Sequence, residues 1–221
     1  MINKKSLIMI ASIACFTACI GDFWVTFVLG GYKPGYSQLR NTMSLLGVTA
    51  SPVSGIISLW WIILGLLIIL FAFGFSKAFG YHKRPVQVAT WLMITYGLGE
   101  GLGSGIFKDD IVNSMTTLSG NIHEILGGIG TAAILILPFI VKIIIPRATN
   151  PGFHTLSLVV FILGLVFLAM FLFRLIPYES NDLMLYKGLW QRLFILDYYI
   201  YLIVIAVIMI KKQHINNIIS K

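Results

Sequence analysis

The sequence predicts an all-α fold: a polytopic transmembrane bundle of six helices, with a short helix at the extracytoplasmic interface after the first span. Three observations predict it. The 221 residues are 58% hydrophobic and 11% charged, with a mean hydropathy of +0.92, which is more apolar surface than a soluble domain of this size can bury. The apolar residues form six runs of about 20, the length that crosses a bilayer. Most Lys and Arg lie between these runs or at the chain ends.

The six expected spans set both the domain and its orientation. They cover residues 7–29, 55–75, 88–107, 122–145, 154–176 and 189–210, so residues 1–221 form a single transmembrane domain. The basic residues before the first span, after the second, between the fourth and fifth, and at the end of the chain all fall on one side. Because positive charge marks the cytoplasmic side, both termini are expected in the cytoplasm, in the plasma membrane of a prokaryote. The net charge of +8 therefore indicates orientation, and no nucleic-acid partner is predicted.

The first span has a rival interpretation as a cleaved signal sequence, because "MINKKSLIMIASIACFTACIG" has a basic start followed by an apolar run. No A-x-A site follows, and the apolar character continues through "FWVTFVLG", which favours a retained span. Cys15 and Cys19 lie four residues apart on one helical face and are interpreted as buried thiols. They predict neither a disulfide framework nor a metal site, and no cofactor is expected.

A polar stretch, "PGYSQLRNTMSLLG", separates the first two spans. Ser37 is the expected N-cap and Gly47 the expected stop of a helix over 37–46, which places Leu39, Met43 and Leu46 on one face. About ten residues make only about 15 Å of helix, too short to span. We expect this helix to lie flat at the outer interface, either as a lid over a polar cavity or as an anchor only.

Glycine recurs through "YGLGEGLGSGIF" in the third span, at positions 97, 99, 101, 103 and 105. Glycines four apart let helices approach closely in a membrane. Two faces of this span carry them, which predicts a central helix that is contacted on two sides. The alternative is a broken helix that lines a cavity, as in transporters.

The ionisable residues inside the spans lie mainly in the extracytoplasmic half. Asp22, for example, is about 15 residues into an outward-running helix, or about 22 Å from the cytoplasmic edge. The candidate polar cluster consists of Asp22, Glu100, His123, Glu124, Arg174, Arg192 and Asp197. The candidate lid or loop residues are Ser37, Arg40, Ser44, Asp109 and Asp110. A polar cavity that opens outward explains this asymmetry.

A purely structural alternative pairs these charges with each other. Arg174 or Arg192 would then neutralise Asp22, Glu100 or Asp197 and fix the helix packing, and we expect at least one arginine to pair with Asp22 or Glu100. Four carboxylates against two arginines still leave an acidic excess, which would call for a proton or a cation.

The order of several motifs resembles a known family. The motifs are "GD" in the first span, "PGYSQLRNTMSLLG", "FKDD", "GNIHE" and "GLWQRLFILDYY". Together they resemble the prokaryotic integral membrane proteins of the domain-of-unknown-function family numbered 998, over nearly the whole chain. The resemblance implies about six transmembrane helices and no established activity. It matches the family's polar motif positions to Asp22, Ser44, Asp109 or Asp110, His123, Arg192 and Asp197.

Three functions are consistent with these features. The favoured one is a non-enzymatic binder of a lipid or other hydrophobic ligand, whose head group is held by the arginines and nearby carboxylates. A proton- or cation-coupled transporter that uses Asp22 and Glu100 is the next, and an intramembrane lipid hydrolase with Ser44, His123 and Asp109 or Asp110 is the third. Membrane lipids are the expected partners, and the sequence leaves open whether the chain forms a homo-oligomer.

Overall fold

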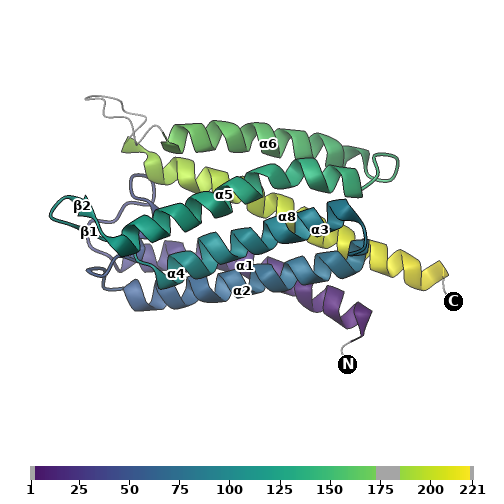
Figure 1. Cartoon of the computed structure of the whole chain (residues 1–221), viewed down its shortest axis with the longest axis horizontal. Helices are drawn as coiled ribbons and strands as arrows, with labels where there is room; N and C mark the ends of the chain where they lie inside the picture. Colours follow the sequence, from purple (N-terminus) through teal and green to yellow (C-terminus); the bar gives the residue numbers. More distant parts are fainter. Residues whose placement is uncertain (1–2, 173–184, 220–221) are drawn as a thin grey trace.

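The protein is a bundle of long helices, seen in a computed structural model that describes residues 3–172 and 185–219 (Figure 1). Within these residues, five helices are long and apolar enough to cross a membrane. They are α1 (Lys4–Gly31), α2 (Ser54–Phe79), α5 (Leu118–Ile144), α6 (Pro151–Leu172) and α8 (Lys187–Ile219). The all-α membrane bundle predicted from hydropathy is confirmed at this level.

The third expected span, 88–107, is built from three consecutive helical pieces. They are α3 (Arg84–Tyr96), the π-helix η2 (Gly97–Gly103) and α4 (Ser104–Ile106). A Cβ at Gly101 would collide with Gly65 of α2, and a Cβ at Gly99 would collide with Leu126 of α5. The prediction of a central helix contacted on two sides is confirmed. The wider π turn is also the local irregularity that the broken-helix alternative anticipated.

The helix expected over residues 37–46 is not formed. The structure has turns at residues 38–40 and only a four-residue 3-10 helix, η1 (Met43–Leu46). Met43 and Leu46 are buried, whereas Leu39 is 49% exposed, so the three side chains do not share one face. The reason is tertiary: main-chain groups of this segment hydrogen-bond to α8, as the backbone bond from Leu189 N–H to the Leu39 carbonyl shows (2.8 Å).

A short β-hairpin precedes α5. Its strands, β1 (Ile111–Val112) and β2 (Met115–Thr116), pair in antiparallel fashion. Asn113 and Ser114 form the turn, and both have positive φ (50° and 61°), as a two-residue turn of this handedness requires. Thr117 then caps α5 by accepting a hydrogen bond from the Gly120 N–H (3.1 Å).

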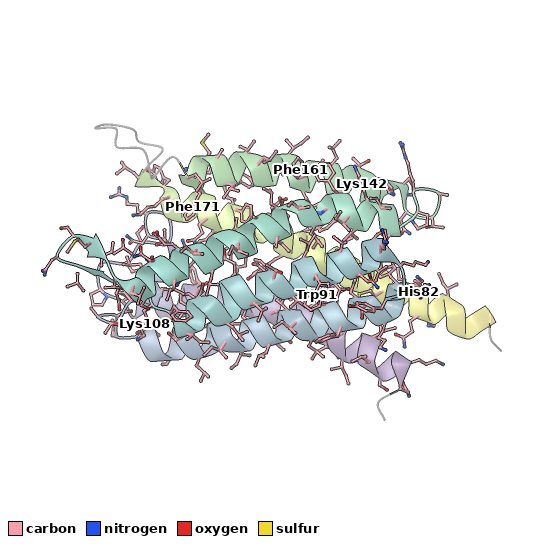
Figure 2. The ribbon with its side chains drawn as sticks, in the orientation of Figure 1. His82, Trp91, Lys108, Lys142, Phe161 and Phe171 are labelled. Carbon is pink, nitrogen blue, oxygen red and sulfur yellow. The ribbon has the colours of Figure 1, made fainter. Side chains whose placement is uncertain are left out.

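The two ends of the bundle differ. Both termini lie at one end, together with the α2–α3 turn, and the β-hairpin lies at the other (Figure 1). In Figure 2, His82 marks the first of these ends and Lys108 the second. Between them, large side chains such as Phe71 and Tyr201 are fully buried, whereas Trp24 is 70% exposed on the outer surface. An apolar exterior of this kind is what a helix presents to lipid.

Candidate functional site

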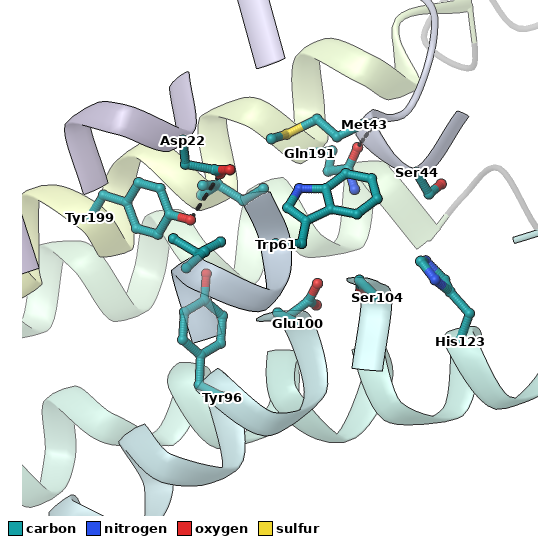
Figure 3. Close-up of a pocket in the computed structure, with 12 residues that line it drawn as sticks. Asp22, Met43, Ser44, Trp61, Tyr96, Glu100, Ser104, His123, Gln191 and Tyr199 are labelled. Atoms are coloured by element: carbon teal, nitrogen blue, oxygen red, sulfur yellow. Dashed lines mark hydrogen bonds between the residues drawn. The ribbon is translucent and has the colours of Figure 1, made fainter. Parts of the chain in front are cut away.

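A polar pocket lies among the helices toward the hairpin end of the bundle. It consists of three adjoining hollows of about 40, 50 and 280 Å³, and Glu100 and Gln191 line all three. Figure 3 shows the smallest hollow, with Asp22 and Tyr199 on one side and Ser44 and His123 on the other. The pocket therefore joins α1, η1, η2, α5 and α8, elements that are far apart in the sequence.

Glu100 enters the pocket from the π turn of η2. Thr131 of α5 donates a hydrogen bond to its Oε1 (2.6 Å). Two glycines of α5 make room for it: a Cβ at Gly130 would lie 3.1 Å from the Glu100 Cγ, and one at Gly127 would lie 3.7 Å from Oε1. The glycine-rich pattern thus serves packing and also seats this carboxylate.

Asp22 lies at the deep end of the pocket and is 2% exposed. Its two carboxylate oxygens accept hydrogen bonds from the Trp60 indole N–H and the Tyr199 hydroxyl, both at 2.9 Å. A buried carboxylate needs such donors, because an unsatisfied one is costly. Aromatic side chains rather than an arginine supply them here.

Arg192 does not form the predicted ion pair with Asp22 or Glu100 in the described part of the chain. Its guanidinium instead donates to the carbonyls of Asn41 and Gly188 (2.9 Å each), to the Tyr36 hydroxyl (2.6 Å) and to the Gln38 side-chain oxygen (2.7 Å). These acceptors are neutral, and three of them belong to the α1–α2 connection. Arg192 therefore fastens that connection to α8 and is not among the residues that line the pocket.

Ser44, Asp109 and His123 meet at the outer part of the pocket, and all three line its 280 Å³ hollow. The Ser44 hydroxyl donates to Asp109 Oδ2 (2.9 Å). His123 Nδ1 lies 2.9 Å from the Phe107 carbonyl oxygen. Because a carbonyl only accepts hydrogen bonds, this contact places a proton on Nδ1.

The remaining candidates are dispersed. Glu124 lines the 280 Å³ hollow, but Asp197 lines none of the three, and its Oδ2 is buried with no hydrogen-bond partner among the described residues. Ser37 and Arg40 lie in the turn of the α1–α2 connection, away from the pocket lining. Arg174 lies outside the described residues.

Asp109 and Asp110, which the sequence left as alternatives, have different partners. Asp110 accepts hydrogen bonds from the Thr49 amide (2.7 Å) and hydroxyl (2.5 Å) and lines none of the three hollows. Its partial burial raises its pKa, but the two Thr49 hydrogen bonds and the nearby Lys108 charge outweigh this and hold the pKa below its usual value. Asp109 is the pocket residue of the pair.

Several pocket residues were not predicted from the sequence. Gln191 accepts a hydrogen bond from the Met43 N–H (2.7 Å) and lines every hollow, and Thr131, Tyr96 and Tyr199 also line the pocket. Gln191 and Thr131 carry a usable signal, because polar side chains are rare within apolar runs. The tyrosines carry none, since buried aromatic residues are ordinary core residues.

The fold and the pocket define the class: this is a multi-pass, mainly helical membrane protein with polar side chains gathered between its helices. The chain belongs to the DUF998 family. Residues 17–208 match the family described as "Protein of unknown function (DUF998)", which confirms the resemblance noted in its motifs. No curated protein and no solved structure gives a significant match.

Proposed function

We propose that this protein binds an amphiphilic ligand with a positively charged head group in the polar pocket, which opens toward the extracytoplasmic side. In this proposal α3, η2 and α4 together form a sixth crossing, and both termini lie in the cytoplasm of a prokaryotic cell. Two facts support the arrangement: the termini lie at one end of the bundle (Figure 1), and most of the basic residues between the apolar runs lie in the connections at that end.

The lining of the 280 Å³ hollow carries the proposal. Glu100, Asp109 and Glu124 give it three carboxylates, and none of its described lining residues is Lys or Arg. Asp109 and Glu124 bring two carboxylates to a lining whose described residues include no Lys or Arg, and such a site favours a cation or a proton. The head group expected here is therefore an amine, whereas the sequence suggested one held partly by arginines.

The opposite wall of the hollow suits an alkyl chain. Leu168, Phe171 and Leu172 of α6 line it. Gly128 of α5, which also lines it, is exposed, so the hollow reaches the lipid-facing side of the bundle between α5 and α6. A ligand could place its amine among the carboxylates and its chain along α6, entering from the membrane.

The geometry favours binding over hydrolysis. The Ser44 hydroxyl donates its hydrogen bond to Asp109, and the described residues include no hydrogen bond from Ser44 to His123. A serine nucleophile needs its base within hydrogen-bond reach. Transport needs a polar path to the other face, and a wide pocket at the far end of the bundle has a different set of lining residues.

The test is a calorimetric titration of octylamine into the detergent-solubilised protein, with protein-free micelles as the blank and octanol as the neutral probe. We expect octylamine to bind more tightly than octanol. Asp109→Asn should weaken octylamine binding about tenfold, because it removes one charged hydrogen bond worth about 1.5 kcal/mol or more. The amide still accepts from Ser44, so the local fold is retained.

Asp110→Asn is the matched control, since it makes the same chemical change one residue away, outside the pocket lining. It should leave octylamine binding unchanged. Equal affinities for octylamine and octanol, or equal losses in the two variants, would rule out the acidic pocket as an amine site.

A further inference from the structure

A second pocket, of about 450 Å³, lies at the end of the bundle that carries both termini. It is formed where α2 ends, α3 begins, α5 passes into the α5–α6 connection, and α8 runs past all three. Its lining residues are Phe79, Lys83, Ile144, Ile145, Pro146, Thr149, Asn150, Ile208, Lys211, Lys212 and Ile215. It shares no lining residue with the acidic pocket.

Three lysines give this pocket its charge. Lys83 comes from the turn before α3, and Lys211 and Lys212 come from α8, and no described lining residue is acidic. The Lys212 ammonium lies 4.4 Å from the centre of the buried Phe79 ring, a cation–π distance that places it above an apolar floor. We call this site the lysine pocket.

The sequence around the lysine pocket is wholly without negative charge. The chain segments at this end, residues 3–15, 72–90, 138–157 and 203–219, contain nine Lys and Arg and no Asp or Glu. Among the described residues, these segments offer Lys83 and Lys211 no carboxylate side chain as a charge partner. An anion from solvent or from the membrane therefore meets no competing Asp or Glu of these segments there.

The walls of the lysine pocket favour an anion from the membrane over an anion from solvent. Five apolar side chains contribute to its lining: Ile144 and Ile145 at the end of α5, Ile208 and Ile215 of α8, and Phe79 of α2. This apolar surface adds nothing to the binding of a free inorganic anion, but it accommodates the hydrocarbon that a lipid anion carries. Basic pockets between helices at the cytoplasmic side of a membrane suit phospholipid head groups for this reason.

We propose that the lysine pocket binds an anionic phospholipid of the inner leaflet, with the phosphate against Lys83 and Lys211 and the start of an acyl chain along Ile208 and Ile215. The site is independent of the proposed amine site, which lies at the other end of the bundle. Its occupant bridges the turn before α3 and α8, so it also links elements that are separated in the sequence.

Native mass spectrometry of the full chain tests the lysine pocket. The protein in detergent is mixed with equal amounts of dioleoylphosphatidylglycerol and dioleoylphosphatidylcholine, and the two lipid adducts are compared. We expect the anionic lipid to predominate. Replacing Lys83 and Lys211 with Gln should reduce that preference about 25-fold, since each basic residue near the bilayer surface contributes about a fivefold effect.

Two further double variants make the result specific. Lys5→Gln with Lys77→Gln removes the same charge from exposed positions at the same end, outside the lining, and should leave the preference unchanged. Lys83→Arg with Lys211→Arg keeps the charge and should retain the anionic lipid. An equal loss in the Lys5/Lys77 variant, or no preference in the wild type, would overturn the proposal.

Discussion

Arg192 shows how a single side chain organises the pocket from outside it. Its planar group has several donors in a fixed geometry, and it places them on the connection between α1 and α2. That connection in turn carries Met43 and Ser44 into the pocket lining. The arginine therefore positions pocket residues without lining the pocket itself.

Replacing Arg192 with Gln should lower the melting temperature of the detergent-solubilised protein clearly. Four acceptors lose a charged donor, and a net loss of about 2–3 kcal/mol is expected. Arg192→Lys should recover only part of this stability, because an ammonium cannot reproduce the planar, forked donor arrangement of the guanidinium. Arg40→Gln is the control, since Arg40 is exposed in the same connection; an equal shift in Arg40→Gln would contradict the positioning role.

Asp110 predicts a pH dependence. Because its pKa is lowered in the folded protein, its stabilising contribution is complete above the ordinary carboxyl pKa of about 4 and is lost as the pH falls through the lowered value. Asp110→Asn should lower the melting temperature by about 2–4 °C at neutral pH. The difference from the wild type should shrink as Asp110 becomes protonated. A melting-temperature difference that stays constant down to about pH 2 would argue against a stabilising role of the Asp110 charge.

At the scale of elements, η2 has two structural roles. Its glycines let it lie against α2 and α5 at the same time, and its π turn directs Glu100 toward Thr131. A regular helix with larger side chains could neither lie so close to α2 and α5 nor direct Glu100 toward Thr131. Irregular helical turns of this kind are frequent at functional sites.

Gly101→Ala should destabilise the bundle by about 1–3 kcal/mol, because the added Cβ would collide with the backbone of Gly65. Gly55→Ala is the matched change in α2, where a Cβ meets nothing within 4 Å, and it should be neutral or slightly stabilising. Thermal unfolding of both purified variants measures this. Equal stability of the two would show that the close contact between η2 and α2 does not form.

At the scale of the whole molecule, the proposed orientation is open to a direct test. Cys15 and Cys19 are buried, so the wild type should give little background with a membrane-impermeant maleimide. Met115→Cys, at the exposed hairpin, should be labelled on intact cells, and His82→Cys, exposed in the α2–α3 turn, only after permeabilisation. The reverse labelling pattern would show that the protein has the opposite orientation in the membrane, with the lysine pocket at the outer leaflet.

Several features follow from the sequence alone. The long apolar helices do, because a bilayer fixes the length of an apolar run and α1, α2, α5, α6 and α8 each reach it. The central place of the glycine-rich segment does too, because closely spaced glycines have few other uses in a membrane. Depth and charge also grouped Asp22, Glu100 and His123 as candidates, and all three line one hollow of the structure.

Partner choice was decided only by the tertiary structure. The sequence led us to expect that Arg174 or Arg192 pairs with a carboxylate. Arg192 instead binds Tyr36, 156 residues away, and Asp22 binds Tyr199, 177 residues away. Residues 37–46 do not form a continuous helix, and two of their main-chain groups, the Leu39 carbonyl and the Met43 N–H, bond to α8. Hydropathy and spacing act within one helix and determine its length and depth. Hydrogen bonds between helices depend on how those helices are rotated against one another, and only their joint packing sets that rotation.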